Sequence, residues 1–428
     1  MDNTKDTEAA VLALKKSLNR DLATALDVCV RCGICSDTCH YYSADPRLGH
    51  VPAYRAELLR RLYRSISNPL ARRFPRLFGA TPVTPESLDA LAETAFTSCT
   101  LCRRCMVNCP MGVDTALIMR AARSVSTASG RAPEMLVQLA DAAISREENL
   151  ELFRDLMLEQ VSELEKGLRE AVADPRASIP VDKQGADILY VGLSGAHTIV
   201  PPAVLFHTVR ANWTLSLFEA SNYGVFLGDS ARAKRIAERI LHEAQRLGVK
   251  EVVVGECGHA YSTLRWEAPK WFGGPLPFRV RSIIELMAEW VSSGAIKLDP
   301  DANPEPITYH DSCNLARNGG LLEEPRVVLR AAARDFREMR PNRENAYCCG
   351  GGSGLVALPE KMELRLKAGA PKSHQVRETG AAVVVASCDN CRIQLGDLSE
   401  HYGLGVEVKG MAEVVVRALV PSRSPALV

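Results

Sequence analysis

The stretch at residues 29–39 reads CVRCGICSDTC, and the stretch at residues 99–109 reads CTLCRRCMVNC. Both follow the spacing C-x2-C-x2-C-x3-C, which is typical of loops that bind a [4Fe-4S] cube. In such a run three thiolates of one tight loop bind one cube, and the fourth cysteine, on the helix that follows, reaches the other cube. We therefore predict two cubes with crossed ligands. One set is Cys29, Cys32, Cys35 and Cys109, and the other is Cys99, Cys102, Cys105 and Cys39.

Zinc and disulfides are the alternatives to iron for these eight cysteines. Zinc fits pairs with the spacing C-x2-C, and disulfides fit any even number of cysteines. Neither alternative explains why a third and a fourth cysteine recur at identical offsets in both stretches. The two copies differ after the last cysteine, where Pro110 stands in the second copy and His40 in the first. This difference leaves the ligands unchanged and predicts a different local turn.

The whole chain restricts the class of protein. Its 428 residues are enough for two or three units with a sizeable core. The formal net charge of +1 gives no indication of nucleic acid as a partner. The first residues do not resemble a signal peptide, and fourteen cysteines without an export signal indicate a reducing compartment. We expect a cytoplasmic protein, with docking to a membrane through a partner subunit as a further option.

A local excess of positive charge lies between the two cysteine stretches, where Glu57 is the only acidic neighbour of seven arginines. One interpretation is a solvated helix face, because basic runs are common on surfaces. The other is electrostatic: nearby cations raise the potential of an anionic cube or dock an acidic partner. The arginines are Arg55, Arg60, Arg61, Arg64, Arg72, Arg73 and Arg76.

Hydrophobic periodicity and linker-like composition divide the chain into four predicted segments. Residues 1–130 are predicted to form a helical ferredoxin-like domain that binds the two cubes, and residues 131–185 a helical connector and linker. Beyond the linker, short β runs alternate with helices at residues 187–191, 251–254, 306–309 and 382–386, which predicts α/β units with buried strands. The fold class is therefore α plus α/β, with α/β modules at residues 186–300 and 301–428.

The two α/β modules share an internal repeat. Aligning residues 252–260 with residues 383–391 places Cys257 on Cys388 and Ala260 on Cys391, and Gly224 then falls near Gly350. The second module alone retains a full set of cysteines, namely Cys313, Cys348, Cys349, Cys388 and Cys391. The first module is therefore predicted to be a degenerate copy.

The five cysteines of the second module predict a third metal centre. Gly350 and Gly351 give the adjacent pair Cys348-Cys349 the freedom to turn, and let backbone N–H groups approach cluster sulfides. Five thiolates from three loops indicate a cluster that is larger or more open than a plain cube. The alternative is a vicinal disulfide at Cys348-Cys349 with a separate zinc pair at Cys388 and Cys391.

These residues resemble a known family. Residues 310–313 (HDSC), 348–352 (CCGGG) and 388–391 (CDNC) are similar to the cysteine-rich CCG module of heterodisulfide reductases. The resemblance implies that Cys313, Cys348, Cys349, Cys388 and Cys391 bind a noncubane [4Fe-4S] cluster fed by the N-terminal domain. The degenerate first module is more similar to the K subunit of the sulfite-reductase-associated membrane complex. Those proteins are thought to act on a disulfide or trisulfide of a small sulfur-carrier protein.

Two functions are compatible with this sequence. In the first, the chain is an oxidoreductase subunit acting on sulfur groups: electrons pass through two cubes to the noncubane site, where a disulfide or polysulfide bond is cleaved or formed. Cys257, His259 and His310 are then the candidate catalytic residues, although Cys257 also fits a buried apolar site and His310 a bracing role. In the second, the chain only transfers electrons for a flavin dehydrogenase of the glycolate, lactate or glycerol-phosphate type.

Both functions require a redox partner, either a membrane cytochrome b or a soluble flavoprotein. The first function also requires a sulfur-carrier protein or a small disulfide as substrate.

Overall fold

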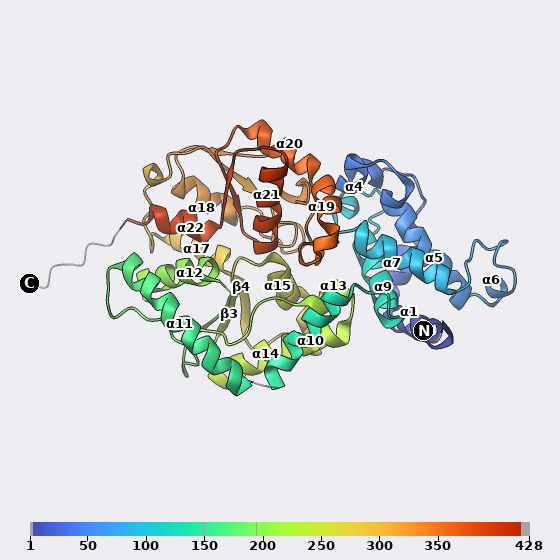
Figure 1. Ribbon diagram of the computed structural model, residues 1–428, viewed down its shortest axis with the longest axis horizontal. Coiled ribbons are helices and arrows are strands. Elements are labelled where there is room, and N and C mark those ends of the chain that lie inside the picture. Colours follow the sequence, from blue (N-terminus) through green and yellow to red (C-terminus); the bar gives the residue numbers. More distant parts are fainter. Residues whose placement is uncertain (1–2, 149, 194, 421–428) are drawn as a thin grey trace, which may run out of the picture. The chain divides into compact units, whose positions relative to one another are not determined.

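The computed structural model describes residues 3–148, 150–193 and 195–420, which fall into two compact units (Figure 1). Unit 1 consists of Met1–Ala142, Tyr223–Ala233 and Glu344–His374, and unit 2 of the remaining segments. The two short segments of unit 1 carry Gly224 and Gly350, the glycines that the internal repeat aligns. The domain boundaries at residues 130, 185 and 300 stay predictions.

Unit 1 is the helical, ferredoxin-like part of the chain, as the sequence predicts. Its helices are α1 (Asn3–Ser17), α2 (Arg20–Val28), α3 (Cys35–Thr38), α4 (His40–Ala44), α5 (Pro52–Ser67), α6 (Pro69–Arg73), α7 (Pro85–Thr97), α8 (Arg104–Val107), α9 (Thr115–Ala128), α13 (Tyr223–Leu227) and α19 (Met362–Ala368). Short 3-10 turns lie at Leu48–His50, Leu355–Ala357 and Pro359–Lys361. Helix α9 packs against α1, α5 and α7 and buries Ile118, Met119, Ala122 and Val125.

Local sequence signals explain where the helices around the cysteine loops begin. Proline is the first residue of α5 and of α7, a position where the missing N–H has no helical partner to lose. Thr84 and Ser87 form a reciprocal capping box at the start of α7. Asp114 caps α9 by accepting from the N–H of Leu117 at 3.1 Å. These caps fix the helix ends from which the cysteine loops depart.

Unit 2 contains two parallel four-stranded sheets. The first has the order β2-β1-β3-β4 and the second the order β6-β5-β7-β8. The four predicted strands are confirmed as β1 (Ile188–Val191), β3 (Glu251–Val254), β5 (Ile307–His310) and β7 (Val383–Ala386). Four further strands were not predicted, and in each sheet they flank the central pair: β2 (Trp213–Leu215), β4 (Arg279–Ser282), β6 (Phe336–Arg337) and β8 (Glu407–Lys409).

The two sheets confirm the predicted duplication, because their strands follow the same order. Tyr190 of β1 pairs with Val253 of β3, and Tyr309 of β5 pairs with Val385 of β7. Cys257 and Cys388 each hold the N-cap position of the helix that follows the third strand of its sheet. The two α/β modules of unit 2 are therefore two copies of the same four-stranded fold.

The two sheets of unit 2 share one apolar core. Val252–Val254 of β3, Val383 and Val385 of β7, and Val414 and Val415 of the last helix belong to one cluster of buried residues. Apolar runs of this kind are typical of parallel strands covered on both faces. The remaining helices of unit 2 are α11 (Leu150–Val172), α12 (Ala196–Thr208), α15 (Gly258–Ser262), α16 (Ala268–Trp271), α17 (Ile283–Ser293), α18 (Glu324–Ala332), α21 (Asp389–His401) and α22 (Met411–Ala418).

Three helices have residues in both units: α10 (Glu134–Glu148), α14 (Ser230–Leu247) and α20 (Ala370–Thr379). The predicted connector at residues 131–185 corresponds to α10 and α11, which lie on either side of residue 149, outside the described residues. One π-helical turn, at Thr263–Glu267, joins α15 to α16.

Candidate iron–sulfur centres

The two cysteine loops of unit 1 have the same backbone conformation. Arg31 and Leu101, at the third position of each run, have φ of 59° and 54°. Gly33 and Arg103, at the fifth position, have φ of 86° and 60°. This repeated left-handed geometry is costly for residues other than glycine, and it turns successive cysteines of one loop toward a common space.

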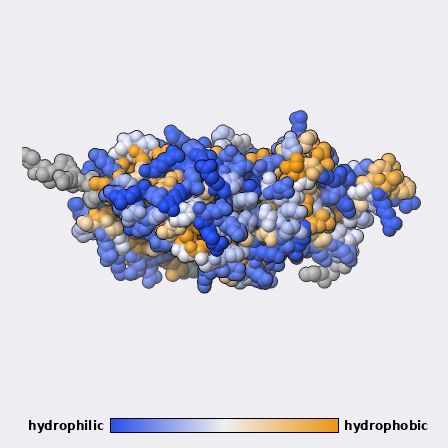
Figure 2. Space-filling model, turned by 90° about the horizontal axis from the view of Figure 1, so that it is seen from above, coloured by the Kyte–Doolittle hydropathy of each residue, from blue (hydrophilic) through white to orange (hydrophobic). Residues whose placement is uncertain are grey.

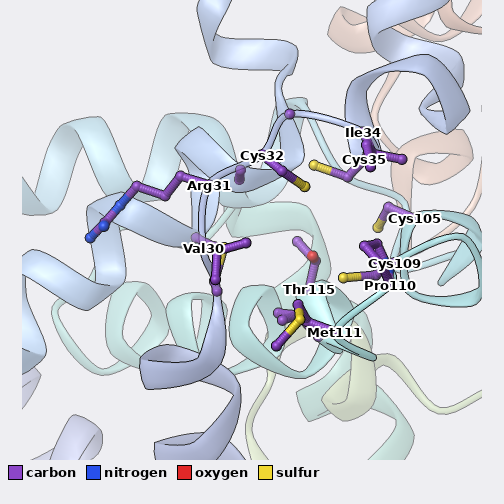
Figure 3. A pocket seen from close by; sticks show the side chains of 15 residues that line it. Val30, Arg31, Cys32, Ile34, Cys35, Cys105, Cys109, Pro110, Met111 and Thr115 are labelled. Atoms are coloured by element: carbon purple, nitrogen blue, oxygen red, sulfur yellow. The ribbon is translucent and has the colours of Figure 1, made fainter.

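The first cavity of unit 1 is lined by Cys29, Cys32, Cys35 and Cys109, together with Cys105 (Figure 3). Ala53 and Ala56 from the start of α5, and Val30, Ile34 and Met111 from the loops, supply an apolar wall. Four of these five cysteines are those of the first crossed set. The structure thus brings the sulfurs of that set together, and their role as ligands stays a prediction.

The second cavity of unit 1 is lined by the four cysteines of the other crossed set: Cys39, Cys99, Cys102 and Cys105. Arg55 reaches into it from α5, and its Nη2 donates to Sγ of Cys39 at 3.5 Å. Within the described residues, Nε and Nη1 of this buried guanidinium have no hydrogen-bond partner. A buried cation without a carboxylate partner requires another anion nearby. An anionic iron–sulfur cube held by these thiolates therefore fits the cavity.

The thiolates also act on the charge state of Arg55. Burial works to lower the pKa of this guanidinium, but the neighbouring sulfurs of Cys39, Cys99 and Cys105 raise it above its ordinary value. Arg55 thus stays positively charged beside the second cavity. Of the arginine-rich segment, Arg55 thus lies beside cysteine sulfurs, while Arg61 and Arg72 lie on the solvent side; the electrostatic interpretation of the segment stays a prediction.

His40, the residue in the place of the usual proline, lies beside sulfurs of two different cysteine motifs. A ring nitrogen of His40 and the Sγ atoms of Cys102 and Cys348 all lie within 4.8 Å of one another. The ring is 2% exposed. Burial alone would lower the pKa of His40, but the sulfurs of Cys348 and Cys102 raise it. Sequence reasoning assigned His40 no role, although its position directly after Cys39 was the available signal.

The loop of Cys348 and Cys349 is anchored to the second cysteine run of unit 1. Ser353 Oγ donates to the carbonyl of Thr100 at 2.8 Å, and Arg104 Nε donates to the carbonyl of Asn345 at 2.7 Å. Thr100 Oγ1 lies 3.4 Å from Sγ of Cys348. These contacts bring Cys348 next to the loop expected to bind the second cube, although the two are far apart in sequence.

Arg123 on α9 also links the second cysteine run to the glycine-rich loop after Cys349, from within the core of unit 1. Its buried guanidinium donates to the carbonyls of Ala95, Cys99, Phe226 and Ser353 at 2.8–3.1 Å. The carbonyls belong to α7, the second cysteine run, α13 and the glycine-rich loop. Burial lowers the pKa of Arg123 to about 10, so the side chain is still a cation at neutral pH.

Gly350, the first glycine after Cys349, makes a hydrogen bond to a cysteine sulfur and a close contact with a neighbouring segment of unit 1. The N–H of Gly350 donates to Sγ of Cys348 at 3.5 Å. Gly350 has φ of 99°, and a Cβ atom there would lie 2.8 Å from the carbonyl oxygen of Arg365. Close packing alone therefore explains the need for glycine at this position. Direct contact of Gly350 and Gly351 with a cluster stays a prediction.

In unit 2 the remaining cysteines lie at the carboxyl ends of the strands. Cys388 caps α21, and a hydrogen bond from Cys391, one helical turn on, lowers the pKa of Cys388. Cys257, from the degenerate module, lies close enough to Cys388 to interact electrostatically. Gly258 approaches the loop after Cys313, where a Cβ atom would lie 2.7 Å from the N atom of Leu315. Carboxyl ends of parallel strands are the usual location of binding sites in such sheets.

His259 forms a hydrogen-bonded pair with Cys257. The N–H of Asn222 donates to Nε2 of His259 at 3.2 Å, so this nitrogen is an acceptor. The other nitrogen, Nδ1, therefore carries the proton of the neutral ring and donates to Sγ of Cys257 at 3.3 Å. Burial lowers the pKa of His259 to about 4, in agreement with a neutral ring. His259 and Cys257 thus lie together as predicted, and their catalytic role stays a prediction.

His310 is the last residue of strand β5 and Asp311 follows it, three and two residues before Cys313. A ring nitrogen of His310 lies within 4.8 Å of Sγ of Cys391. Asp311 receives two hydrogen bonds from the buried Arg326, both at 2.8 Å, and one from the N–H of Arg343 at 2.7 Å. Asp311 therefore fixes the strand end, while His310 faces the cysteine pair of unit 2.

The five cysteines of the predicted third centre come from both units. Cys348 and Cys349 belong to unit 1, and Cys313, Cys388 and Cys391 belong to unit 2. All five are buried. The noncubane ligand set stays a prediction.

Comparison with known proteins agrees with the chemistry of the cysteine motifs. A family profile of the 4Fe-4S dicluster domain matches residues 25–113, and a profile of the cysteine-rich domain matches residues 307–396. The Hdr-like menaquinol oxidoreductase iron-sulfur subunit 2 of Archaeoglobus fulgidus is 31% identical to this chain, over 95% of the chain and 82% of the relative. The chain belongs to the Hdr-like iron–sulfur subunits.

Other relatives of this Hdr-like protein are more distant. A subunit of the dihydromethanophenazine:CoB–CoM heterodisulfide reductase of Methanosarcina barkeri is 26% identical over 94% of the chain and 96% of the relative. The EtfAB:quinone oxidoreductase of Syntrophomonas wolfei is 26% identical over 87% of the chain and 55% of the relative.

Membership in this family has two direct consequences, to which the structure adds one observation on the helices. The Hdr-like protein is an iron–sulfur oxidoreductase that transfers electrons, and it works with redox partner subunits. Its cysteine-rich regions bind iron–sulfur clusters. No helix within the described residues combines the length and the apolar composition needed to cross a bilayer.

Proposed function

We propose that this chain relays electrons through two [4Fe-4S] cubes to a noncubane [4Fe-4S] cluster where a sulfur–sulfur bond is cleaved or formed. The cubes are held by the two crossed cysteine sets of unit 1. The third cluster is held by Cys313, Cys348, Cys349, Cys388 and Cys391. The substrate is a disulfide or polysulfide on a sulfur-carrier protein or a small molecule. In this proposal, cleavage of the sulfur–sulfur bond takes up two electrons, delivered through the cubes, and two protons; it gives two thiols from a disulfide or a thiol and a persulfide from a polysulfide, and bond formation is the reverse.

The observation that carries the proposal is the proximity of Cys348 to the second cysteine run. Cys348 and Cys102 both lie beside His40, with ring nitrogen and sulfurs within 4.8 Å of one another. A ligand of the expected second cube and a ligand of the expected third cluster are therefore neighbours inside unit 1. Short separations of this kind favour electron transfer from one cluster to the next.

The protons that accompany the electrons need groups that can supply them. Cys257 offers its thiol, and the neutral ring of His259 donates its Nδ1–H to that sulfur as a hydrogen bond; both residues follow strand β3 at a strand end of unit 2, as Cys388 follows β7. His310 offers a second ring close to Cys391. When bound, an iron–sulfur cluster with an accessible iron would supply a site for one sulfur of the substrate. The side chains of Cys257, His259 and His310 would hold or deliver protons around it.

A second function is favoured by the names of two relatives, a menaquinol oxidoreductase subunit and a quinone oxidoreductase. In this alternative the chain exchanges electrons with a quinone-reactive or flavin-containing partner and binds no sulfur substrate. The degenerate first module agrees with it, because a chain with one five-cysteine set cannot divide a disulfide between two such clusters.

Electron paramagnetic resonance of the purified, iron-loaded chain distinguishes these functions. If the first is correct, the oxidised protein shows a paramagnetic signal that changes on addition of a thiol or a persulfide. Replacing a predicted ligand, Cys349→Ser, abolishes the signal, while Cys257→Ser retains it. Iron analysis should give about twelve irons per chain, as expected for three four-iron clusters.

Two results would contradict the sulfur chemistry. One is a signal that no sulfur compound alters, combined with rapid oxidation of a menaquinol analogue by the chain and its partner. The other is zinc in place of iron at the cysteine-rich module, which would also remove the electron-transfer alternative at that centre.

A further inference from the structure

A surface of exposed arginines and apolar side chains lies in unit 1, outside the cysteine cavities. It comprises helix α6 and the loop that follows, residues 69–79, which we call the basic tip. In Figure 1 the tip extends beyond the helices α5 and α7 that carry it. Arg72, Arg73 and Arg76 are exposed on it, and so are three large apolar residues.

The positive charge of the basic tip is not neutralised by its surroundings. Residues 58–85 contain six arginines and no acidic residue. Arg60 and Arg61 pair with Glu57 on α5. For Arg72, Arg73 and Arg76, no carboxylate in the described part of the chain lies within ion-pair distance. These three guanidinium groups are therefore available to an anionic partner.

The apolar residues of the basic tip face the solvent. Leu70 is 59% exposed, Phe74 is 54% exposed and Leu77 is 80% exposed. Figure 2 shows apolar side chains gathered over α6 of unit 1, with hydrophilic side chains beside them. Single exposed apolar residues are ordinary on protein surfaces. Three of them within eight residues, interleaved with arginines, form a cluster that scattered single residues do not account for.

The backbone of the basic tip is held in place by its own hydrogen bonds. Asn68 caps α6 by accepting from the N–H groups of Leu70 and Ala71 at 2.9 and 3.2 Å. The N–H of Thr81 donates to the carbonyl of Arg61 at 3.1 Å, which closes the loop back onto α5. The backbone that carries the apolar side chains is therefore already folded. Little conformational entropy of the backbone would be lost when these side chains bind a partner.

We propose that the basic tip docks this chain on the surface of an anionic lipid bilayer. Leu70, Phe74 and Leu77 enter the boundary between headgroups and acyl chains, while Arg72, Arg73 and Arg76 pair with lipid phosphates. The charge is complementary to anionic headgroups, and interleaved arginines and apolar residues are typical of segments that lie in this interface. A protruding tip suits lipid better than a protein partner, because apolar side chains can enter a fluid interface without a matching pocket.

Docking at this point would orient the electron-transfer path. Helix α5 begins at the first cysteine cavity, where Ala53 and Ala56 line it, and ends at the basic tip. Its 16 residues span about 24 Å at ~1.5 Å per residue. With α5 upright on the bilayer the first cube would lie at about that distance from the lipid surface, and a tilted helix would bring it closer. This inference holds for both functions considered above, since it does not depend on the substrate.

Co-sedimentation of the iron-loaded full chain with lipid vesicles tests the proposal. We expect binding to phosphatidylcholine vesicles that contain phosphatidylglycerol, and little binding to phosphatidylcholine alone. The triple substitution R72Q, R73Q and R76Q should weaken binding about 100-fold, because each arginine near such a surface contributes ~1 kcal/mol. F74S with L77S should weaken it as well, and added salt should weaken the wild type.

Matched controls come from helices α1 and α2 of the same unit. K15Q, K16Q and R20Q remove the same charge from exposed positions, and L12S removes an apolar side chain that is 54% exposed, as Phe74 is. These variants should bind vesicles like the wild type. The proposal is overturned if the wild type does not bind anionic vesicles at physiological salt, or if the tip and control substitutions weaken binding equally. Binding of the tip to an acidic partner subunit with no vesicle binding would also overturn it.

Discussion

At the scale of single residues, His40 is the clearest difference between the two cysteine loops of unit 1. The second loop has Pro110 at this position, and proline has no donor group. His40 places a buried imidazole between Cys102 and Cys348 instead. A ring N–H directed at a cluster sulfur stabilises the reduced, more negative state of that cluster.

We therefore predict that His40→Leu shifts the midpoint potential of one cube to a more negative value. Redox titration followed by electron paramagnetic resonance measures this shift, and iron content should be unchanged because His40 is not an expected ligand. His50→Gln is the matched control, since His50 is also a buried histidine of unit 1 but bonds the carbonyl of Asp45. An equal shift in both variants would argue against a specific role for His40.

The buried carboxyl group of Glu243, on α14 in unit 2, should make the stability of the protein depend on pH. It accepts from the N–H of Leu217 at 2.8 Å and from the hydroxyl of Ser216. Burial raises its pKa from an ordinary value of 4.5 to about 7. The folded state then binds a proton more tightly than the unfolded state, so this stabilisation is complete below pH 4.5 and is lost as the pH rises through 7.

Chemical denaturation between about pH 5 and about pH 8.5 tests this expectation. The free energy of unfolding of the wild type should fall over this range by up to about 3 kcal/mol from this residue. Glu243→Gln keeps a hydrogen-bond acceptor and cannot ionise, so its stability should vary less with pH. If the wild type and the variant showed identical pH profiles, Glu243 would not be the group responsible.

Among the structural elements of unit 1, the short helix after each cysteine loop determines which cavity the fourth cysteine of that run lines. Cys39 comes after α3, and it lines the cavity of the second loop, not of its own. Cys109 comes after α8, and it lines the cavity of the first loop. The local helix therefore carries the fourth cysteine of each run away from its neighbours in sequence.

Double substitutions test the crossed ligand sets. Cys39→Ser combined with Cys102→Ser should remove one cube, about four irons, because both residues serve the same cluster. Cys39→Ser combined with Cys32→Ser should impair both cubes, with a loss approaching about eight irons. Iron analysis and the two cluster signals measure the outcome. The reverse pattern would show that each cube takes all four ligands from one run.

At the scale of the whole molecule, the two units differ in what stabilises them. Unit 2 has a continuous apolar core that includes both sheets. Unit 1 buries the guanidinium of Arg55 among thiol groups, where an anionic cluster would balance its charge. Without clusters, that cation remains buried and poorly compensated, which is strongly unfavourable.

Removal of iron should therefore loosen unit 1 more than unit 2. In hydrogen–deuterium exchange, we expect faster exchange in α5 and α9 after anaerobic treatment with a chelator, and little change in β3 and β7. Reconstitution with iron and sulfide should restore the slow exchange. Equal acceleration in both units would mean that the clusters stabilise the chain globally, and the explanation based on Arg55 would then be wrong.

Much of this organisation could be predicted from the sequence because it is encoded locally. The two cysteine spacings and the apolar runs at β1, β3, β5 and β7 depend on residues close together in the chain, and the alignment of Cys257 with Cys388 compares two such local patterns. The outer strands were missed for a physical reason. Strands such as β6, with two residues, and β8, with three, are too short and too polar to give an alternating or apolar signal.

The residues that are chemically able to bind clusters could be identified from their spacing, because ligand spacing within one loop is a local property. Which of these residues become neighbours depends on the three-dimensional fold. The placement of His40 and Arg55 among the sulfurs, the anchoring of the Cys348 loop on Thr100, and the four carbonyls gathered by Arg123 all join residues that are distant in sequence. Such contacts arise from the packing of whole helices, and no spacing pattern in the chain records them.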